Sequence, residues 1–422
     1  MKKTVCIVGL GYVGLPLAHA FAREGFATIG YDIAQSRIAE LQKGHDRTGE
    51  LSDGQLKMVA IRFSTDPSVM READVIILAI PTPVDDANKP DLSLVESATR
   101  TVGKNVKKGA IIVYESTVYP GVTEEICGPI LEKESGLTQH QDFKLGYSPE
   151  RINPGDKEHT VDKIVKVVAG EDEETTDALV DLYGAVVKAG IHRAPNIKVA
   201  EMAKAIENAQ RDINIAFVNE IALLCKKIGI RSKDVLDAAG TKWNFLRFQP
   251  GLVGGHCIGV DPYYLVEKAG QLGLTTHVIT AGRAINDGMS AFIAKDVVEH
   301  LSVPKAGARV LVLGLTFKEN VPDTRNSKAV TVVEHLQSLG CTVAVHDPHV
   351  SAADFERLKF SKGDLDSGPH DALVYLVPHR EYKAEPIDRF IHAVKPGGVL
   401  FDLKSLLDGE AIVRSGRKYL AL

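Results

Sequence analysis

A glycine-rich motif that directly follows an apolar run near the N-terminus constrains the fold more than any other feature. The run Val5 to Val8 leads into Gly9-Leu10-Gly11-Tyr12-Val13-Gly14, and helix-like spacing begins at Leu15. In a strand–turn–helix unit, the first glycine permits the tight turn, the second lets a pyrophosphate approach, and the third allows close helix packing. The helix N-terminus then faces the phosphates with unpaired N–H groups. The motif therefore predicts a dinucleotide-binding βαβ unit.

An acidic residue stands at the position where such a unit recognises a ribose. Asp32 ends the second predicted strand, Ala27 to Tyr31. Its carboxylate would accept hydrogen bonds from the adenosine ribose hydroxyls and repel a 2′-phosphate, which favours NAD over NADP. The alternative is a glycine turn without a ligand, and the order of strand, glycines, helix, strand and acid favours the cofactor.

The pattern along the 422 residues predicts more than one domain. Short apolar runs alternate with helical patterns in the first third, and the same alternation returns after Pro304. Between these regions, Val199 to Ile228 contains neither Pro nor Gly and predicts one long helix. The predicted fold class is α/β, with two doubly wound Rossmann-like domains joined by a long central helix and a helical segment. The expected domain boundaries are 1–195, 196–303 and 304–422.

Composition narrows the classes of function. The net charge of -5 gives no reason to expect a nucleic-acid or membrane partner. The cysteines number 5, without CxxC spacing, so a disulfide framework and a metal site are not expected and a cytoplasmic location fits better. The N-terminal apolar run is interrupted by glycines, so we interpret it as a strand rather than a signal peptide. No apolar stretch reaches the roughly 18 residues that a membrane span needs.

One loop carries a cysteine in an unusual setting. It reads Gly251-Leu252-Val253-Gly254-Gly255-His256-Cys257-Ile258-Gly259-Val260-Asp261. The glycine pair lets another group approach the backbone closely, and a thiol there can act as a nucleophile if a cation or base favours its thiolate. The alternative is a small buried hydrophobic residue, as most free cysteines are. The loop by itself leaves both readings open.

Polar residues at strand ends are further candidates, because ligands of open α/β sheets bind outside the carboxyl ends of strands. Thr82 and Thr117 follow two predicted strands and are candidate contacts of a nicotinamide, with an ordinary turn or cap residue as the alternative. Arg151 lies in a polar loop after Phe143 to Tyr147, and its guanidinium suits a phosphate. Its alternative is a surface charge.

Two cationic groups lie further along the chain. Lys204 and Asn208 share one face of the long helix and Arg211 continues it. A lysine held among small residues beside a reacting carbonyl would stabilise an oxyanion, whereas a solvated helix face is the commoner case. Phe317-Lys318 and Asp323-Thr324-Arg325 follow the first strand of the last α/β region and would suit a second nucleotide diphosphate. For these loops the functional and the structural reading stay balanced.

Together these motifs resemble the UDP-sugar 6-dehydrogenases, or nucleotide-sugar dehydrogenases, over essentially the whole chain. The resemblance rests on the glycine motif with Asp32, Glu115-Ser116-Thr117, Lys204 with Asn208, the cysteine loop with Asp261, and the two cationic loops. The stretch Lys242 to Tyr264 looks most like the branch that acts on UDP-N-acetylhexosamines, UDP-GlcNAc or UDP-GalNAc, for capsule, Vi-type and O-antigen synthesis.

The resemblance implies a four-electron oxidation of the sugar C6 hydroxyl to a carboxylate, with two NAD⁺ reduced. Cys257 would form a thiohemiacetal and then a thioester, which water would cleave. Lys204 would stabilise the oxyanions, Asn208 would add a hydrogen bond, Asp261 would orient Lys204 or a water, and Thr117 would help to place a water. The first domain would hold NAD and the last the UDP-sugar, with the site between domains and a homodimer through the long helix.

The implied contacts fall into two sets. The NAD contacts would be Gly9, Gly11, Tyr12, Val13, Gly14, Asp32, Arg37, Thr82, Thr117 and Arg325. The UDP-sugar contacts would be Arg151, Lys204, Asn208, Arg211, Gly254, Phe317 and Lys318.

One residue departs from the family pattern. UDP-glucose dehydrogenases carry a water-activating glutamate four residues after the position of Glu150, and here that place is Pro154. Water activation would then depend on Thr117, Asp261 or Glu150, and UDP-glucose becomes a less favoured substrate.

Several alternatives remain open at the level of sequence. They are a UDP-ManNAc or UDP-glucose 6-dehydrogenase, a one-step dehydrogenase of the 3-hydroxyacid type, and a non-catalytic NAD-binding regulator. The one-step enzyme would need neither Cys257 nor a second α/β domain, and the regulator leaves Lys204 and Cys257 without a shared purpose.

Overall fold

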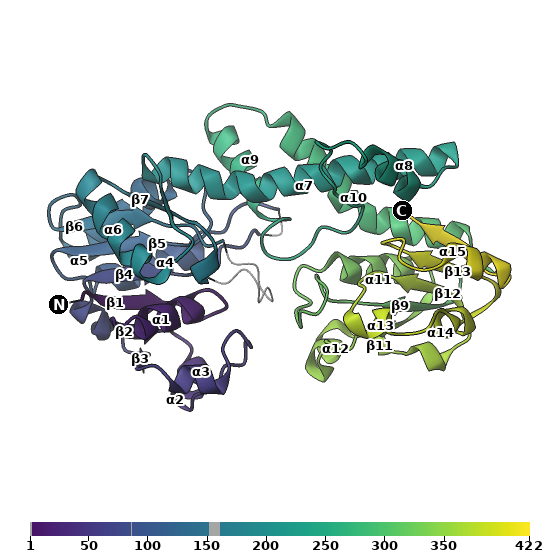
Figure 1. The fold of residues 1–422 in the computed structure, drawn as a ribbon, viewed down its shortest axis with the longest axis horizontal. Helices are drawn as coiled ribbons and strands as arrows, with labels where there is room; N and C mark the ends of the chain where they lie inside the picture. The colour runs from purple at the N-terminus through teal and green to yellow at the C-terminus, as the bar shows by residue number, and fades with distance from the viewer. Residues whose placement is uncertain (1, 86, 152–160) are drawn as a thin grey trace. The chain divides into compact units, whose positions relative to one another are not determined.

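The first alternating region folds into an eight-stranded sheet with the order β3-β2-β1-β4-β5-β6-β7-β8 (Figure 1). The computed structural model describes residues 2–85, 87–151 and 161–422, so Pro154 lies outside the described residues. Neighbouring strands are parallel except β6 and β7, which pair antiparallel. The strand order reverses between β1 and β4, and ligands of open sheets bind at such a switch point. The strands are β1 (Thr4–Val8), β2 (Ala27–Tyr31), β3 (Ile61–Ser64), β4 (Val75–Leu78), β5 (Ala110–Tyr114), β6 (Phe143–Tyr147), β7 (Lys166–Gly170) and β8 (Ile191–Arg193).

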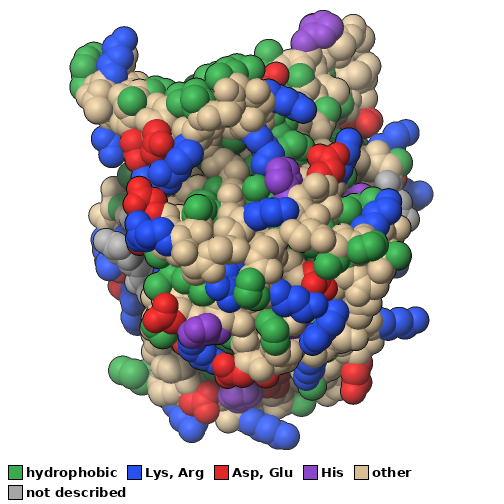
Figure 2. All heavy atoms as spheres, turned by 90° about the vertical axis from the view of Figure 1, so that its right-hand side faces the viewer, with side chains coloured by type: hydrophobic (Ala, Val, Ile, Leu, Met, Phe, Trp, Pro, Cys, Tyr) green, Lys and Arg blue, Asp and Glu red, His purple; other side chains and the backbone are tan. Residues whose placement is uncertain are grey.

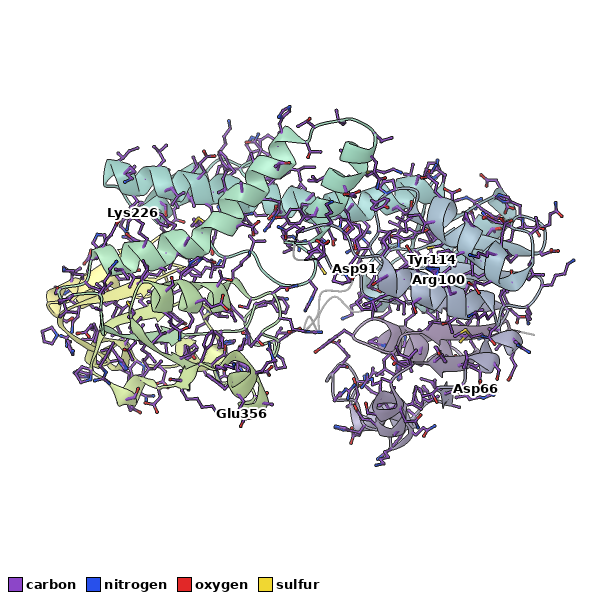
Figure 3. All side chains as sticks on the ribbon, turned by 180° about the vertical axis from the view of Figure 1, so that it is seen from behind. Asp66, Asp91, Arg100, Tyr114, Lys226 and Glu356 are labelled. Atoms are coloured by element: carbon purple, nitrogen blue, oxygen red, sulfur yellow. The ribbon has the colours of Figure 1, made fainter. Side chains whose placement is uncertain are left out.

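Helices bury both faces of this sheet because side chains alternate across each strand. Val5 and Ile7 of β1 join one core cluster with residues of α1, α2 and α6, and Cys6 between them points to the other face. On α4, Thr99 bonds the hydroxyl of Tyr114, the last residue of β5, which Figure 3 labels. The helices are α1 (Gly14–Arg23), α2 (Gln35–Gln42), α3 (Asp53–Lys57), η1 (Pro67–Glu72), α4 (Ser93–Gly103), η2 (Val122–Cys127), α5 (Gly128–Ser135), η3 (Val161–Lys163), α6 (Glu173–Val186) and α9 (Asp261–Gln271).

The second alternating region folds into a six-stranded parallel sheet with the order β11-β10-β9-β12-β13-β14. Val310 and Val312 of β9 pack into one core cluster, and Leu311 and Leu313 into another, so both faces are again buried. The strands are β9 (Arg309–Leu313), β10 (Thr342–His346), β11 (Ser361–Lys362), β12 (His370–Tyr375), β13 (Val394–Asp402) and β14 (Lys418–Ala421). The helices of this region and of the central segment before it are α8 (Ser232–Ala239), α10 (His277–Glu299), α11 (Lys328–Ser338), α12 (Ala352–Leu358), η4 (Leu365–Ser367), α13 (Arg380–Lys383), α14 (Ile387–His392) and α15 (Gly409–Arg414).

The predicted long helix is α7 (Ile197–Ile228), with 32 residues. Near its end, Lys226 forms an ion pair of 2.7 Å with the buried Asp296 of α10 (Figure 3). The chain divides within α7 into two compact units, Met1–Glu207 with Tyr263–Thr275 and Asn208–Pro262 with Thr276–Leu422. The α/β fold class with its long central helix is confirmed, and the division into three domains stays a prediction.

The two sheets begin with the same local device. Gly9 has a φ of 91° and donates its N–H to Tyr31 O, and Leu10 N–H then bonds the carboxylate of Asp32. In the second sheet Gly314 has a φ of 89° and donates to His346 O, and Leu315 N–H bonds Asp347. The two sheets therefore correspond both in the glycine turn after β1 and β9 and in the acid after β2 and β10.

Candidate active site

The glycine motif forms the tight turn between β1 and α1 that the sequence predicts. A Cβ on Gly14 would lie 1.9 Å from Gly9 O, so only glycine allows the start of α1 to approach the turn this closely. A Cβ on Gly11 would meet nothing within 4 Å, so the space above Gly11 is open to a ligand. Tyr12 and Val13 complete the turn, and Val13 is the N-cap of α1. These features fit a pyrophosphate at the helix N-terminus.

Asp32 and Arg37 both organise this turn. The Asp32 carboxylate accepts N–H groups from Leu10 and Ala34, each at 2.9 Å. Arg37 is buried, and its guanidinium donates to Leu10 O at 2.9 Å and to Asp46 at 2.8 Å. Arg37 thus supports the turn from within the protein, and its predicted contact with NAD stays a prediction.

The loops that carry Thr82 and Thr117 are joined directly. Ser116 Oγ donates to Ile80 O at 2.7 Å and accepts Ile80 N–H at 3.2 Å, which links the chain after β5 to the chain after β4. Both threonines are partly exposed. They therefore follow strands at the carboxyl edge of the sheet, where the sequence placed them.

Glu150 follows β6 and lies within a buried charged cluster. Lys166 Nζ is 2.9 Å from Glu115 Oε2 and 3.6 Å from Glu150 Oε2. Tyr183 OH donates to the other oxygen of Glu115 at 2.5 Å. Burial raises the pKa of Glu115, and Lys166 opposes that shift. Burial alone would lower the pKa of Lys166, but Glu115 and Glu150 together raise it.

The other predicted residues of this part lie on or near α7. Arg151 pairs with Glu207 at 2.6 Å and donates to Val165 O at 2.9 Å. Lys204 is buried, with 7% of its surface exposed, whereas Arg211 is exposed. A buried lysine among alanines fits oxyanion stabilisation better than a solvated helix face does.

In the second unit, the cysteine loop is clamped at both ends by α7. Asn219 donates to Gly251 O at 3.0 Å and accepts Gly251 N–H at 2.8 Å. At the other end, Asn208 donates to the carboxylate of Asp261 at 2.5 Å. The structure thus brings the predicted pair Asn208 and Asp261 together.

The thiol itself is exposed. Of the 5 cysteines, Cys257 is exposed and the others are buried. Its carbonyl accepts the N–H of Asp261, the first residue of α9, at 2.8 Å. Its exposure contradicts the alternative of a packed hydrophobic residue.

The glycine pair before Cys257 packs against the loop after β9. A Cβ on Gly254 would lie 2.5 Å from Asn326 O, and one on Gly255 would lie 2.6 Å from the Phe317 ring. Gly255 also has a φ of 84°, which favours glycine. The motif glycines therefore dock the thiol loop onto the predicted substrate loop.

A cavity of about 160 Å³ opens where these loops meet, within the second unit. Its lining includes the predicted residues Gly254, Phe317 and Lys318, and also Lys404, which follows β13. Burial lowers the pKa of Lys404, and its Nζ donates to Pro250 O at 3.2 Å. Lysines at the carboxyl ends of parallel strands suit a diphosphate.

Arg325, predicted to reach the cofactor, pairs with Asp323 at 2.7 Å. Asp323 also bonds His256 Nε2 at 3.2 Å. The Asp323 carboxylate therefore joins the residue before the thiol to the loop after β9.

Comparison with known proteins identifies the chain. Models of the UDP-glucose/GDP-mannose dehydrogenase family match the NAD binding domain at residues 3–187, the central domain at 198–288 and the UDP binding domain at 311–409. The chain belongs to the UDP-glucose/GDP-mannose dehydrogenase family. The resemblance stated from the motifs and the prediction of NAD as the cofactor are both confirmed.

Individual relatives of this dehydrogenase cover nearly its whole length. Protein CapL of Staphylococcus aureus is 49% identical over 99% of each chain. The UDP-N-acetyl-D-glucosamine 6-dehydrogenase of Pseudomonas aeruginosa is 48% identical over 96% of this chain and 97% of its own. The solved structure of the UDP-D-ManNAc dehydrogenase of Pyrococcus horikoshii has a TM-score of 0.89 at 30% identity, covering 99% of this chain and 98% of its own.

Three residues that contact the predicted site residues of this dehydrogenase were not predicted from its sequence. Lys404 follows a strand, so the same rule that selected Lys318 could have selected it. His256 adjoins Cys257 but carries no motif signal of its own. Lys166 begins an apolar strand, and its partners are distant in sequence.

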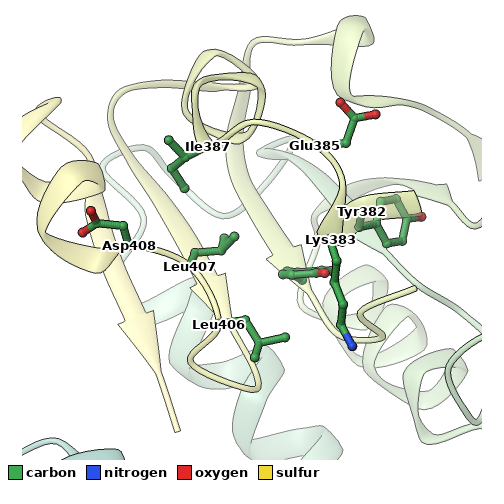
Figure 4. A pocket seen from close by; sticks show the side chains of 8 residues that line it. Tyr382, Lys383, Glu385, Ile387, Leu406, Leu407 and Asp408 are labelled. Carbon is green, nitrogen blue, oxygen red and sulfur yellow. The ribbon is translucent and has the colours of Figure 1, made fainter. Parts of the chain in front are cut away.

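A second cavity of the UDP-binding region holds none of the predicted residues (Figure 4). It encloses about 360 Å³ and is lined by Tyr375, Tyr382, Lys383, Glu385, Ile387, Leu406, Leu407 and Asp408.

The face drawn in Figure 2 mixes basic and acidic side chains, so neither sign of charge dominates there. Within the residues that the structure describes, no helix is long and apolar enough to cross a membrane, and no group of three His, Cys, Asp or Glu could hold a metal ion.

Proposed function

We propose that the chain is an NAD-dependent UDP-N-acetylhexosamine 6-dehydrogenase that makes a UDP-uronic acid, from UDP-GlcNAc or UDP-GalNAc, for surface polysaccharide. The observation that carries the proposal is the exposed thiol of Cys257 on a loop that also lines a lysine-bearing cavity through Gly254. A thiol beside a nucleotide-sugar site can hold an aldehyde covalently between two oxidations.

The residues divide the chemistry into four steps. The C6 hydroxyl first loses a hydride and a proton, which leaves an aldehyde. The Cys257 thiolate then adds to its carbon, and the oxyanion takes a proton to form a thiohemiacetal. Loss of a second hydride and that proton gives a thioester. Water finally attacks the carbonyl carbon, the C–S bond breaks, and the thiolate and carboxylate are released.

NAD⁺, when bound at the turn of Gly9, Gly11 and Gly14, supplies the hydride acceptor for each oxidation. Lys204 would stabilise the oxyanions, with Asn208 donating to the same oxygen and Asp261 orienting them. Glu150 or Asp261 would accept the proton of the hydrolytic water, and Thr117 would help to place that water. Because Lys204 and Asn208 are both buried, their charge and dipole act at low dielectric, where they are strongest.

The relatives support an N-acetylhexosamine of the gluco series. The UDP-N-acetyl-D-glucosamine 6-dehydrogenases of Pseudomonas aeruginosa and Salmonella typhi are 48% and 42% identical to this chain. A UDP-N-acetyl-D-mannosamine dehydrogenase of Methanocaldococcus jannaschii is 33% identical. A one-step dehydrogenase would leave both the exposed thiol and the second sheet without a purpose.

The proposal is tested by NADH formation with UDP-GlcNAc, UDP-GalNAc, UDP-ManNAc and UDP-glucose. We expect two NADH for each sugar nucleotide consumed, with the highest kcat/KM for one of the first two substrates. A stoichiometry of one NADH would contradict the thioester route, and preference for UDP-ManNAc or UDP-glucose would contradict the assigned sugar. No reduction of NAD⁺ with any of the four would favour the non-catalytic alternative.

Lys404 provides a test of the nucleotide site. Replacing it by methionine removes one cation from the cavity, so we expect KM for the sugar nucleotide to rise roughly 10- to 100-fold, the value of a hydrogen bond to a charged group. We expect kcat to change little because this contact is made equally in the ground state and the transition state. Steady-state kinetics check this result, with the exposed Lys305→Met as the matched control. A fall in kcat at unchanged KM would contradict it.

The predicted homodimer is supported by an apolar stripe on α7. Met202, Ile206, Phe217, Leu224 and Ile228 are 43%, 47%, 53%, 54% and 61% exposed. Their successive spacings of four, eleven, seven and four residues keep them on one side of the helix. A second copy of this chain is the occupant that we propose, because a self-complementary helix face closes a two-fold dimer.

The double variant Phe217→Glu and Leu224→Glu is expected to sediment as a monomer, because each carboxylate would be buried without a partner. Sedimentation velocity measures this result, and Leu272→Glu, which changes a more exposed leucine outside the stripe, is the control. A wild-type chain that sediments as a monomer would contradict the proposed dimer.

The five cysteines are free thiols, which supports the predicted cytoplasmic location.

A further inference from the structure

Lys166 is a buried cation that the proposed chemistry does not yet use. It is the first residue of β7, and only 4% of its surface is exposed. Placing an ammonium in the interior costs several kcal/mol unless it is well paired. Lys166 meets that requirement with two carboxylates at once, Glu115 at 2.9 Å and Glu150 at 3.6 Å.

Glu115 is held from both sides, so it fixes the position of the lysine. One of its oxygens accepts Lys166 Nζ, and the other accepts Tyr183 OH at 2.5 Å. The Lys166 ammonium also lies over the Tyr183 ring, 5.3 Å from its centroid. With Glu115 and Tyr183 both buried, the ammonium has little freedom to move.

Glu150 is the less buried carboxylate of the pair. Its side chain is 13% exposed, against 0% for Glu115. The loop that carries Glu150 is itself tied to this cluster, because Glu150 N–H donates to Glu115 O at 3.4 Å. The outer carboxylate therefore has two neighbours that limit its movement: Arg151 N–H donates to its Oε1 at 2.6 Å, and the Lys166 ammonium lies 3.6 Å from its Oε2.

We propose that Lys166 is a positioning residue, which orients the Glu150 carboxylate and favours its ionised form as the base for thioester hydrolysis. The proposal rests on the proposed function. In this step Glu150 takes a proton from water, the water oxygen bonds to the carbonyl carbon, and the C–S bond to Cys257 breaks. Lys166 keeps its own proton and touches neither the water nor the substrate.

The charged groups around Glu150 act on its carboxylate in opposite directions. Lys166 on β7 favours the ionised carboxylate, and Glu115 after β5 disfavours it. Tyr183 on α6 is a neutral neighbour, and the guanidinium of the adjacent Arg151 is paired with Glu207. Removing the Lys166 charge should therefore slow thioester hydrolysis most at low pH, and removing the Glu115 charge should have the opposite effect.

The experiment follows the decay of the uronyl adduct on Cys257 by intact mass after a rapid quench, across a pH series. For Lys166→Met we expect the acidic limb of the decay rate to move about one unit to higher pH, as expected for loss of an opposite charge at this range. For Glu115→Gln we expect it to move to lower pH. Lys166→Arg should restore the wild-type limb, and Lys144→Met, which removes a lysine paired with Asp172, should leave it in place.

Opposite displacements distinguish positioning from support of the fold. A purely structural role predicts slower decay in both variants at an unmoved limb, and that result would overturn the inference. If Lys166→Met does not fold, the displacement in Glu115→Gln decides alone. Wild-type enzyme that forms no adduct on Cys257 would overturn the proposed function instead, whatever the variants do.

Discussion

Replacing Cys257 by alanine is expected to reduce formation of the uronic acid by on the order of 10⁶-fold, the scale of loss seen when a nucleophile is removed. The thioester needs a sulfur, and the other cysteines are buried in the cores of the two units. The binding of NAD should not change, because the glycine turn belongs to the other unit. The uronic acid is measured by chromatography and NAD binding by fluorescence titration.

The same substitution at a buried thiol is the control. Cys341→Ala removes a cysteine that precedes β10 and should retain activity within about twofold, since the site chemistry does not involve it. Intact mass should detect a uronyl adduct in wild type and in Cys341→Ala but not in Cys257→Ala. Uronic acid formed at the wild-type rate by Cys257→Ala would refute covalent catalysis.

Alanine at Gly11 and alanine at Gly14 are expected to weaken dinucleotide binding for different reasons. At Gly11 the new Cβ meets no protein atom within 4 Å, so the fold should be retained. It would occupy the space into which a pyrophosphate approaches, and we expect NAD affinity to fall on the order of 100-fold, or about 2.7 kcal/mol. At Gly14 the Cβ would lie 1.9 Å from Gly9 O, so α1 must shift and stability should fall by about 1–3 kcal/mol.

Thermal unfolding and NAD titration separate the two effects. Gly11→Ala should unfold at the wild-type temperature and bind NAD weakly, whereas Gly14→Ala should fail in both measurements. Gly288→Ala, in the middle of α10 with open space at its Cβ, is the control and should gain up to about 1 kcal/mol from helix propensity. Unchanged NAD affinity in Gly11→Ala would show that the cofactor does not use this turn.

Much of the fold was predictable because its signals are local. The strand, the glycines and Asp32 follow one another within one βαβ unit, and the absence of Pro and Gly from Val199 to Ile228 predicted α7. The antiparallel pairing of β7 with β6 was not predicted. Apolar periodicity indicates a strand, but the direction of pairing depends on contacts distant in sequence.

The candidate site divides in the same way. Cys257 and Lys318 lie in motifs, so sequence was sufficient to select them. Lys166 and Asn219 act through partners that are remote in the chain, Glu115 and Gly251, and no spacing connects such pairs. Burial could not be predicted from sequence, and it is burial that distinguishes the Lys204 side chain from the exposed Arg211, seven residues further along the helix.

The acid that follows the glycine turn has different contacts in the two sheets. After β10, the Asp347 carboxylate is 5% exposed and accepts the N–H groups of Leu315 and Thr316. It also bonds His379 Nε2 at 3.0 Å. Because Asn320 N–H donates to His379 Nδ1, the Nε2 carries the proton and points it at Asp347. The acid that would read a ribose diol is thereby occupied in the second sheet, whereas Asp32 stays partly accessible in the first. The second sheet therefore keeps the glycine turn of the first but buries the acid that the first sheet leaves partly accessible.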